Sequence, residues 1–223
     1  MLRAERLVLR QFFTFAMAFL LLCLGACEQN SPPSAQALKG KQLDDKAAPG
    51  KSPKGGFHHT DITGSSLKPV LNLPDRSGSA KQVADFQGKI LLVFFGFTHC
   101  PDVCPSTLQE AAEAMSLLSA DQAQRVQVIF VTLDPQRDQP DMLEAYVKAF
   151  HPGFGWLRGD EEQTKAAAKS FRVFFEKVTP KSGGPYTIDH TAASFVFDAQ
   201  GRLRLYVKHA QGAKLLADDL AKL

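Results

Sequence analysis

Residues 90–105 read ILLVFFGFTHCPDVCP, and this stretch decides the fold of the chain. The apolar run from Ile90 to Phe95 does not alternate with polar residues, which predicts a strand buried on both faces of a mixed or parallel sheet. A helical pattern follows from Cys104 to Leu118. Cys100 and Cys104 are therefore expected at a strand-to-helix corner, where the helix dipole favours thiolate over thiol.

The remainder of residues 57–223 predicts one further series of strands and helices. Strands are expected at residues 126–133, 173–178, 193–197 and 203–207, with a shorter one at 70–73, and helices at 139–150, 161–171 and 212–223. This order predicts an α/β class, with a thioredoxin-like fold whose central mixed sheet is flanked by helices and carries insertions. Open α/β folds place their sites at the carboxyl edge of the sheet, where the cysteine pair is expected.

Residues 1–27 have the pattern of an export signal. Three arginines lie among the first ten residues, and the apolar run from Phe12 to Leu24 is short for a membrane span. The sequence from Leu24 to Cys27 resembles a bacterial lipobox, which predicts cleavage before Cys27 and a lipid on that cysteine. The alternatives are an ordinary signal peptide and an uncleaved anchor. All three place the folded domain outside the cytoplasm, at a membrane and facing the periplasm.

Residues 28–56 predict a flexible tether. They contain four Pro, four Gly and five Lys but only two bulky apolar residues, so they cannot bury enough surface to offset the entropy of ordering. Residues 57–223 form the expected domain and hold 18 Lys and Arg against 19 Asp and Glu. This nearly neutral balance gives no basic face, and no nucleic-acid partner is expected.

Cys100 and Cys104 are the two cysteines of the expected domain, because Cys23 falls in the signal and Cys27 would carry the lipid. Two cysteines do not make a disulfide scaffold, so the pair is available for chemistry. Three residues separate them, a spacing that favours a metal chelate and still permits a disulfide. We expect Pro105 at the first helical position, which places Cys104 near the start of the helix.

A third group is needed to choose between metal binding and redox chemistry, and the candidates are the six histidines. His190 lies just before the expected strand 193–197, in the loop that faces the cysteine pair in a thioredoxin-like fold. From its position alone, His190 is as much expected to be a metal ligand as not to be one. His58 and His59 are expected to be a solvated pair at the tether junction, His99 to point away from Cys100, and His151 and His209 to lie on the surface.

Three sequence blocks resemble the signatures of the Sco/SenC family. They are residues 96–105 around the cysteine pair, residues 131–138 (VTLDPQRD), and residues 189–192 (DHTA). The family consists of membrane-tethered, thioredoxin-like copper proteins linked to assembly of the CuA centre of cytochrome c oxidase. The resemblance implies that Cys100, Cys104 and His190 are copper ligands.

This resemblance implies a copper metallochaperone. It would take copper, as Cu(I) and also as Cu(II), from a donor chaperone and pass it to cytochrome c oxidase subunit II or another periplasmic copper protein. The ligand types agree, because thiolates select Cu(I) and imidazole suits copper, whereas a structural zinc site normally has four protein ligands. The alternative is a thiol–disulfide oxidoreductase that reduces partner cysteines before metallation, and a peroxiredoxin-type peroxidase is a weaker third hypothesis.

Asp134 and Asp138 follow the expected strand 126–133. Two interpretations are equally favoured: a turn and helix cap, or groups that support the metal ligands or face a partner.

Overall fold

The structure is a computed structural model that describes residues 56–181 and 183–223. The predicted signal and Cys27 lie outside the described residues, as does nearly all of the predicted tether. The described residues contain no helix that is both long and apolar enough to cross a membrane.

A mixed six-stranded sheet forms the centre of the described residues. Its order is β1 (Thr60–Asp61), β10 (Leu203–Lys208), β9 (Ala193–Phe197), β4 (Ile90–Gly96), β5 (Val126–Thr132) and β6 (Gly155–Leu157). β4 runs parallel to β5 and antiparallel to β9, with Val93 opposite both Ile129 and Phe195. All seven residues of β4 are buried, which confirms the prediction from the apolar run.

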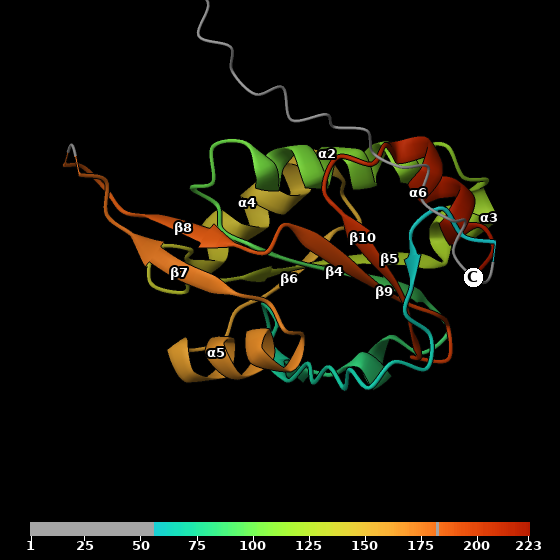
Figure 1. Ribbon diagram of the computed structural model, residues 1–223, viewed down its shortest axis with the longest axis horizontal. Coiled ribbons are helices and arrows are strands. Elements are labelled where there is room, and N and C mark those ends of the chain that lie inside the picture. The colour runs from blue at the N-terminus through green and yellow to red at the C-terminus, as the bar shows by residue number, and fades with distance from the viewer. Residues whose placement is uncertain (1–55, 182) are drawn as a thin grey trace, which may run out of the picture. The chain divides into compact units, whose positions relative to one another are not determined.

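Helices cover both faces of this sheet (Figure 1). α2 (Val103–Ser116), α4 (Pro140–Phe150) and α6 (Ala213–Leu220) lie on one face, and α5 (Glu161–Ser170) lies on the other. The second face also carries the short hairpin of β2 (Leu73–Pro74) and β3 (Ala80–Lys81) and the 3-10 turn η1 (Val83–Phe86), while α3 (Ala120–Gln124) precedes β5. This arrangement confirms the predicted α/β fold with a central mixed sheet flanked by helices.

A two-stranded ribbon projects from the sheet next to the cysteine loop. It consists of β7 (Phe175–Val178) and β8 (Thr187–His190), which pair antiparallel with Phe175 opposite His190. The sequence predicted a strand at 173–178 but a loop around His190. That second expectation was wrong, because residues 187–190 form backbone hydrogen bonds with β7.

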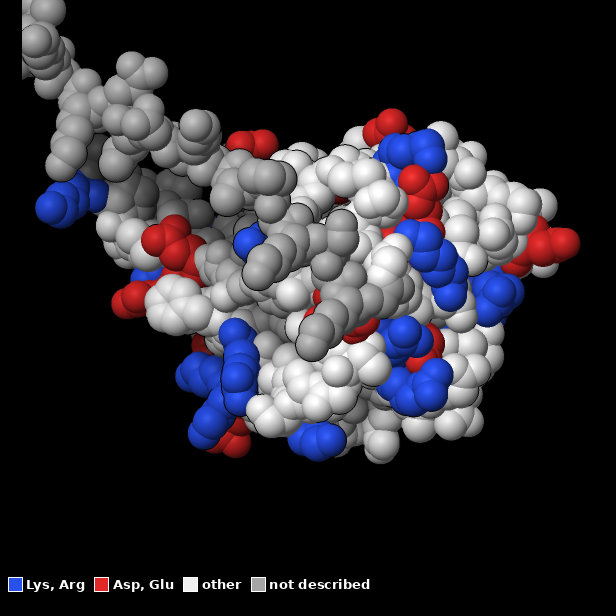
Figure 2. Space-filling model, turned by 45° about the vertical axis from the view of Figure 1, so that its right-hand side comes forward, with Lys and Arg blue, Asp and Glu red and all other residues white. Residues whose placement is uncertain are grey.

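Charges on the surface are mixed. On the face in Figure 2, basic and acidic side chains are interspersed, in keeping with the even balance of residues 57–223. Several form ion pairs, such as Lys214 Nζ with Asp218 Oδ1 at 2.7 Å. Such exposed pairs contribute little to stability.

Candidate metal centre

The loop between β4 and α2 positions both cysteines. Cys100 lies in this loop, and Cys104 is the second residue of α2, so the helix begins two residues before the predicted position at Pro105. The Cys104 backbone N–H donates to Cys100 Sγ at 3.3 Å. An otherwise unpaired amide of the first helical turn thus points at the first sulfur.

Gly96 makes room for the second sulfur. A Cβ atom at this position would lie 2.8 Å from Cys104 Sγ and 2.8 Å from the Phe130 ring. The Cys104 side chain has no exposed surface, whereas Cys100 is partly exposed. Solvent and any incoming partner therefore reach the pair from the Cys100 side.

His190 completes the group from the end of β8. Its Nε2 atom lies 3.5 Å from Cys104 Sγ, and its Nδ1 atom lies 3.1 Å from the Thr191 carbonyl oxygen. Because a carbonyl only accepts, Nδ1 carries the proton and the lone pair of Nε2 faces the sulfur. Phe94 and Phe97 pack edge-on against the imidazole with centroid distances of 6.1 and 6.0 Å. The ring is thus oriented as histidine ligands usually are.

The three donor atoms of Cys100, Cys104 and His190 all lie within 4.8 Å of one another. A hydrogen bond from the Cys104 side chain lowers the pKa of Cys100 to about 4, against burial. The same hydrogen bond and burial raise the pKa of Cys104. The free pair therefore shares one proton at neutral pH, with the thiolate on the exposed sulfur.

Asp138 supports the cysteine loop. Its carboxylate is completely buried and accepts hydrogen bonds from the Thr98 hydroxyl at 2.6 Å, the Thr98 backbone N–H at 3.1 Å, and the Thr132 hydroxyl. Burial, which outweighs these bonds, raises the pKa of Asp138. The carboxylate ties the end of β5 to a residue two positions before Cys100.

Asp134 supports the ribbon that carries His190. It is buried, pairs with Arg137 and accepts a hydrogen bond from the Tyr186 hydroxyl at 2.8 Å. Arg137 in turn lies over the Tyr186 ring at 3.7 Å and donates to the Tyr186 carbonyl oxygen. Burial of Asp134 and Asp138 excludes the partner-facing interpretation, and their contacts favour support of the site. Sequence reasoning missed Tyr186, which lies outside the three blocks.

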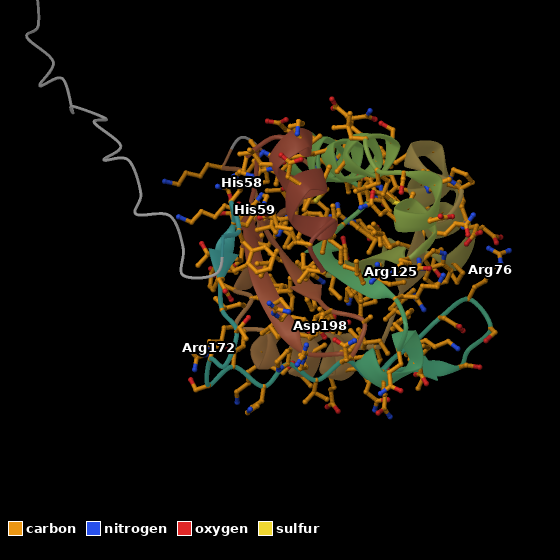
Figure 3. The ribbon with its side chains drawn as sticks, turned by 90° about the vertical axis from the view of Figure 1, so that its right-hand side faces the viewer. His58, His59, Arg76, Arg125, Arg172 and Asp198 are labelled. Atoms are coloured by element: carbon orange, nitrogen blue, oxygen red, sulfur yellow. The ribbon has the colours of Figure 1, made fainter. Side chains whose placement is uncertain are left out.

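The other histidines do not join this group. His99 bonds to Thr98 and not to either sulfur, and His209 bonds to Thr107. The expectation of a solvated pair at the tether junction was wrong for His59, which is 1% exposed and whose Nδ1 atom lies 2.9 Å from Asp219 Oδ2. Figure 3 shows His58 and His59 beside the C-terminal helix α6, where the chain enters the domain.

Comparison with known proteins identifies the family. The SCO1/SenC family model matches residues 60–223. The chain belongs to the SCO1/SenC family. Curated relatives of this SCO1/SenC protein include an SCO2-like protein of Rickettsia felis, 36% identical over 62% of this chain and 66% of its own length. The human mitochondrial SCO2 homolog is 33% identical over 68% of this chain and 58% of its own length. The chain thus spans less than two thirds of the length of these curated relatives.

Solved structures of the family show the same fold. ScoI of Bradyrhizobium japonicum with copper bound is 36% identical, with a TM-score of 0.61 over 70% of this chain and 97% of that chain. Apo Sco1 of Thermus thermophilus is 40% identical, with a TM-score of 0.64 over 74% and 98%. Yeast Sco1 with copper bound is 30% identical, with a TM-score of 0.63 over 70% and 87%.

The donor set of this chain fits copper. Two soft sulfurs and one imidazole nitrogen converge, the imidazole presents a lone pair, and one sulfur carries the thiolate in the free protein. Hard, oxygen-preferring ions such as Mg²⁺ and Ca²⁺ do not match these atoms.

Proposed function

We propose that this chain binds one copper ion through Cys100, Cys104 and His190. The observation that carries the proposal is the convergence of two sulfurs and a correctly oriented imidazole within 4.8 Å. Its occurrence in a family with copper-bound solved members supports copper as the ion. Two thiolates and one imidazole satisfy three-coordinate Cu(I), while Cu(II) would take a further ligand such as water.

Zinc is the competing metal, and the donor count argues against it. Structural zinc sites normally close with four protein ligands. Among the described residues, the group of potential metal ligands around the cysteine pair contains three. A site of three donors with one partly exposed thiolate suits an ion that must leave again.

We propose that the copper is cargo. The site opens on a cavity of about 280 Å³ lined by Cys100, Asp189 and His190 among others, so an acceptor ligand can approach the bound ion. Delivery would proceed by ligand exchange to an extracytoplasmic site such as the CuA centre of cytochrome c oxidase subunit II, after loading by a donor chaperone. The expected oxidase role comes from the family resemblance, and the open site supports the exchange step.

A second function, thiol–disulfide oxidoreduction, is favoured by the pKa pattern. An exposed, low-pKa thiolate beside a buried thiol is the arrangement of an attacking and a resolving cysteine. Cys100 would attack a partner disulfide, and Cys104 would then release the reduced partner and leave the pair oxidised. If this is the main function, His190→Ala spares reductase activity whereas Cys100→Ser abolishes it.

We also propose that residues 1–27 direct export and that Cys27 carries a lipid. Residues 28–56 would then be the tether that joins the membrane to the domain of residues 57–223. Mass spectrometry of the mature chain tests this proposal. The expected result is an N-terminus at Cys27 that carries acyl chains; a chain that retains Met1 contradicts it.

An anaerobic Cu(I) titration against a competing chelator tests the copper site. The full chain is used with Cys23→Ser and Cys27→Ser, so that two thiols are left. We expect one tight equivalent, weakened at least tenfold, or about 1.4 kcal/mol, by His190→Ala. His58→Ala is the control, because its side chain is 43% exposed and lies at the tether junction. A Cu(I) affinity that His190→Ala leaves unchanged contradicts the proposed site.

Delivery needs a separate measurement. The copper-loaded chain is mixed with a soluble, copper-free CuA domain, and the visible spectrum of the assembled centre is followed. Copper transfer that requires contact between the two proteins and is lost with Cys100→Ser supports the metallochaperone function. Transfer of reducing equivalents without copper supports the oxidoreductase instead.

A further inference from the structure

The strand β8 has a partner on one side only. It pairs with β7 in a two-stranded ribbon outside the six-stranded sheet, so its other edge faces no strand among the described residues. An edge strand presents unpaired N–H and C=O groups, and a second chain can pair with them. This open edge belongs to the strand that carries His190.

The register of the ribbon shows which backbone groups are open. In an antiparallel pair, residues whose N–H and C=O groups face the partner strand alternate with residues whose groups face away. The Thr191 N–H donates to the Phe174 carbonyl oxygen at 3.0 Å, so Thr191 and, two residues earlier, Asp189 face β7. The N–H and C=O groups of Ile188 and His190 therefore point away from β7, and no backbone group in the described turns and loops pairs with them.

This open edge borders the cavity of the metal centre. The cavity of about 280 Å³ is lined by all four residues of β8 and by the residues from Cys100 to Val103, but by no residue of β7. An extended segment placed in the cavity would therefore lie along the outer edge of β8. It would also lie beside Cys100, the exposed sulfur of the pair.

The charges at the cavity indicate which kind of segment fits. Asp102 and Asp189 line the cavity and are exposed, whereas none of the described residues that line it is Lys or Arg. Glu176 lies directly opposite Asp189 on the ribbon, and like charges in such a pair are destabilising. Two thiolates and Cu(I) together leave a net negative charge at the centre. A positively charged segment complements this edge.

We propose that β8 is the docking strand for the protein that exchanges copper with this chain, and that this partner supplies an extended segment carrying Lys or Arg. The segment pairs through its backbone with Ile188 and His190, and its basic side chains lie near Asp102 and Asp189. When a strand is added to an open edge, the main chain supplies affinity and the side chains supply specificity. The inference rests on the proposed function, which requires such a partner.

Three pentapeptides test the docking strand. The first is Lys-Val-Met-Val-Lys, acetylated and amidated so that its ends carry no charge. The second has Glu in place of both Lys. The third is the basic peptide with its backbone nitrogens methylated, which keeps the side chains and removes the N–H donors. Each is added to the full chain with Cys23→Ser and Cys27→Ser, reduced, copper-free, ¹⁵N-labelled and held in a neutral detergent.

We expect the basic peptide to shift the amide signals of Ile188 and His190 saturably and to slow their hydrogen exchange at least tenfold. The amides of Phe175 and Lys177 are the matched control, because they face away from β8 on the other edge of the ribbon, and they should not respond. The acidic and the methylated peptides should bind at least tenfold more weakly. Equal binding of the methylated peptide overturns the backbone pairing, and equal binding of the acidic peptide overturns the basic partner.

Asp189→Asn tests the charge without changing the backbone. It should weaken the basic peptide at least threefold at low salt, and the difference should vanish at high salt. Asp121→Asn is the control, because this exposed carboxylate lies on α3, at the end of the domain away from the ribbon (Figure 1). An affinity for the peptide that Asp189→Asn leaves unchanged overturns recognition by this carboxylate.

Two other outcomes are separable from these. If the Ile188 amide shifts with the concentration of the chain alone, the occupant is a second copy of the chain, and the proposed partner is wrong. Failure of the proposed function has a different signature: the chain then binds no tight Cu(I) in the chelator titration, whatever the peptides do.

Discussion

Gly96→Ala should damage the metal centre through a single methyl group. The added Cβ would lie 2.8 Å from both Cys104 Sγ and the Phe130 ring. Ordinary contacts between such atoms begin near 3.4 Å, so the sulfur, the ring or the strand must move by about 0.6 Å or more. The sulfur is the neighbour whose displacement matters, because a site must hold its ligands to within roughly 0.5 Å.

Two effects follow from this displacement. Overpacking in a buried strand costs about 1–3 kcal/mol of unfolding free energy. Movement of Cys104 Sγ should also weaken Cu(I) binding at least tenfold, or about 1.4 kcal/mol. The assays are urea unfolding of the copper-free chain and Cu(I) competition with a chelator.

Gly155→Ala is the matched control. Its Cβ would meet the end of the Ile129 side chain, also at 2.8 Å, but no residue of the metal group. This variant should lose less stability, because the end of the Ile129 side chain can shift, and it should keep copper affinity. Wild-type copper affinity in Gly96→Ala, or an equal loss of affinity in both variants, would refute the displacement of Cys104 Sγ.

Three further predictions concern protons and the buried carboxylates. Because the pKa of Cys100 is lowered to about 4 and that of Cys104 is raised, Cu(I) binding at pH 8 should release about one proton. Calorimetry in two buffers of different ionisation enthalpy measures it, and two protons would contradict the shared-proton pair. Asp138→Asn should weaken copper affinity about tenfold and cost about 1–3 kcal/mol of stability, because it disrupts the carboxylate that accepts hydrogen bonds from Thr98. Asp141→Asn, at a side chain that is 95% exposed, is the control and should change neither quantity in the same assays. Equal effects of the two substitutions would contradict the role of Asp138 in supporting the cysteine loop. Burial raises the pKa of Asp219, but N–H groups of His59 and other donors outweigh it and lower the pKa overall. The stabilisation of the fold by the Asp219 carboxylate is thus fully present above the unfolded-state pKa of about 4, and it is lost as the pH falls through the lower pKa of the folded state. Asp219→Asn should therefore destabilise the chain by about 2–4 kcal/mol at pH 7 and by less at pH 3, and a difference constant with pH in urea unfolding would contradict this.

Local sequence patterns predicted the central part of the fold. The apolar runs that became β4 and β5 and the polar turn of the β9–β10 hairpin were predictable because their buried residues are contiguous in sequence. β6 has three residues, Gly155–Leu157, and forms an edge of the sheet, which is too short for a periodic signal. Its pairing with β5 depends on contacts that a local pattern does not contain.

The candidate site was less predictable than the fold. The sequence indicates Cys100 and Cys104 through their spacing and through their position between a predicted strand and a predicted helix. His190 lies 86 residues beyond Cys104, and only the β7–β8 ribbon brings its Nε2 atom to the sulfur. The segment Thr187–His190 is polar and does not resemble a buried strand, so its strand pairing with Phe175–Val178 was missed.

His59 shows the same limit at the other end of the domain. Two adjacent histidines after a Lys-rich segment resemble a solvated pair. His59 is instead buried by α6, where Asp219 accepts from its ring and its backbone N–H across 160 residues of sequence. Nothing local to His59 signals a partner so far along the chain.

X-ray absorption at the copper edge identifies the ligands of the bound ion. The full chain, with Cys23→Ser and Cys27→Ser, is loaded anaerobically with one equivalent of Cu(I). We expect two sulfur ligands and one imidazole, with the imidazole signal lost in His190→Ala and kept in His99→Asn. A sulfur-only site, or an imidazole signal that survives His190→Ala, would contradict the Cys100–Cys104–His190 centre.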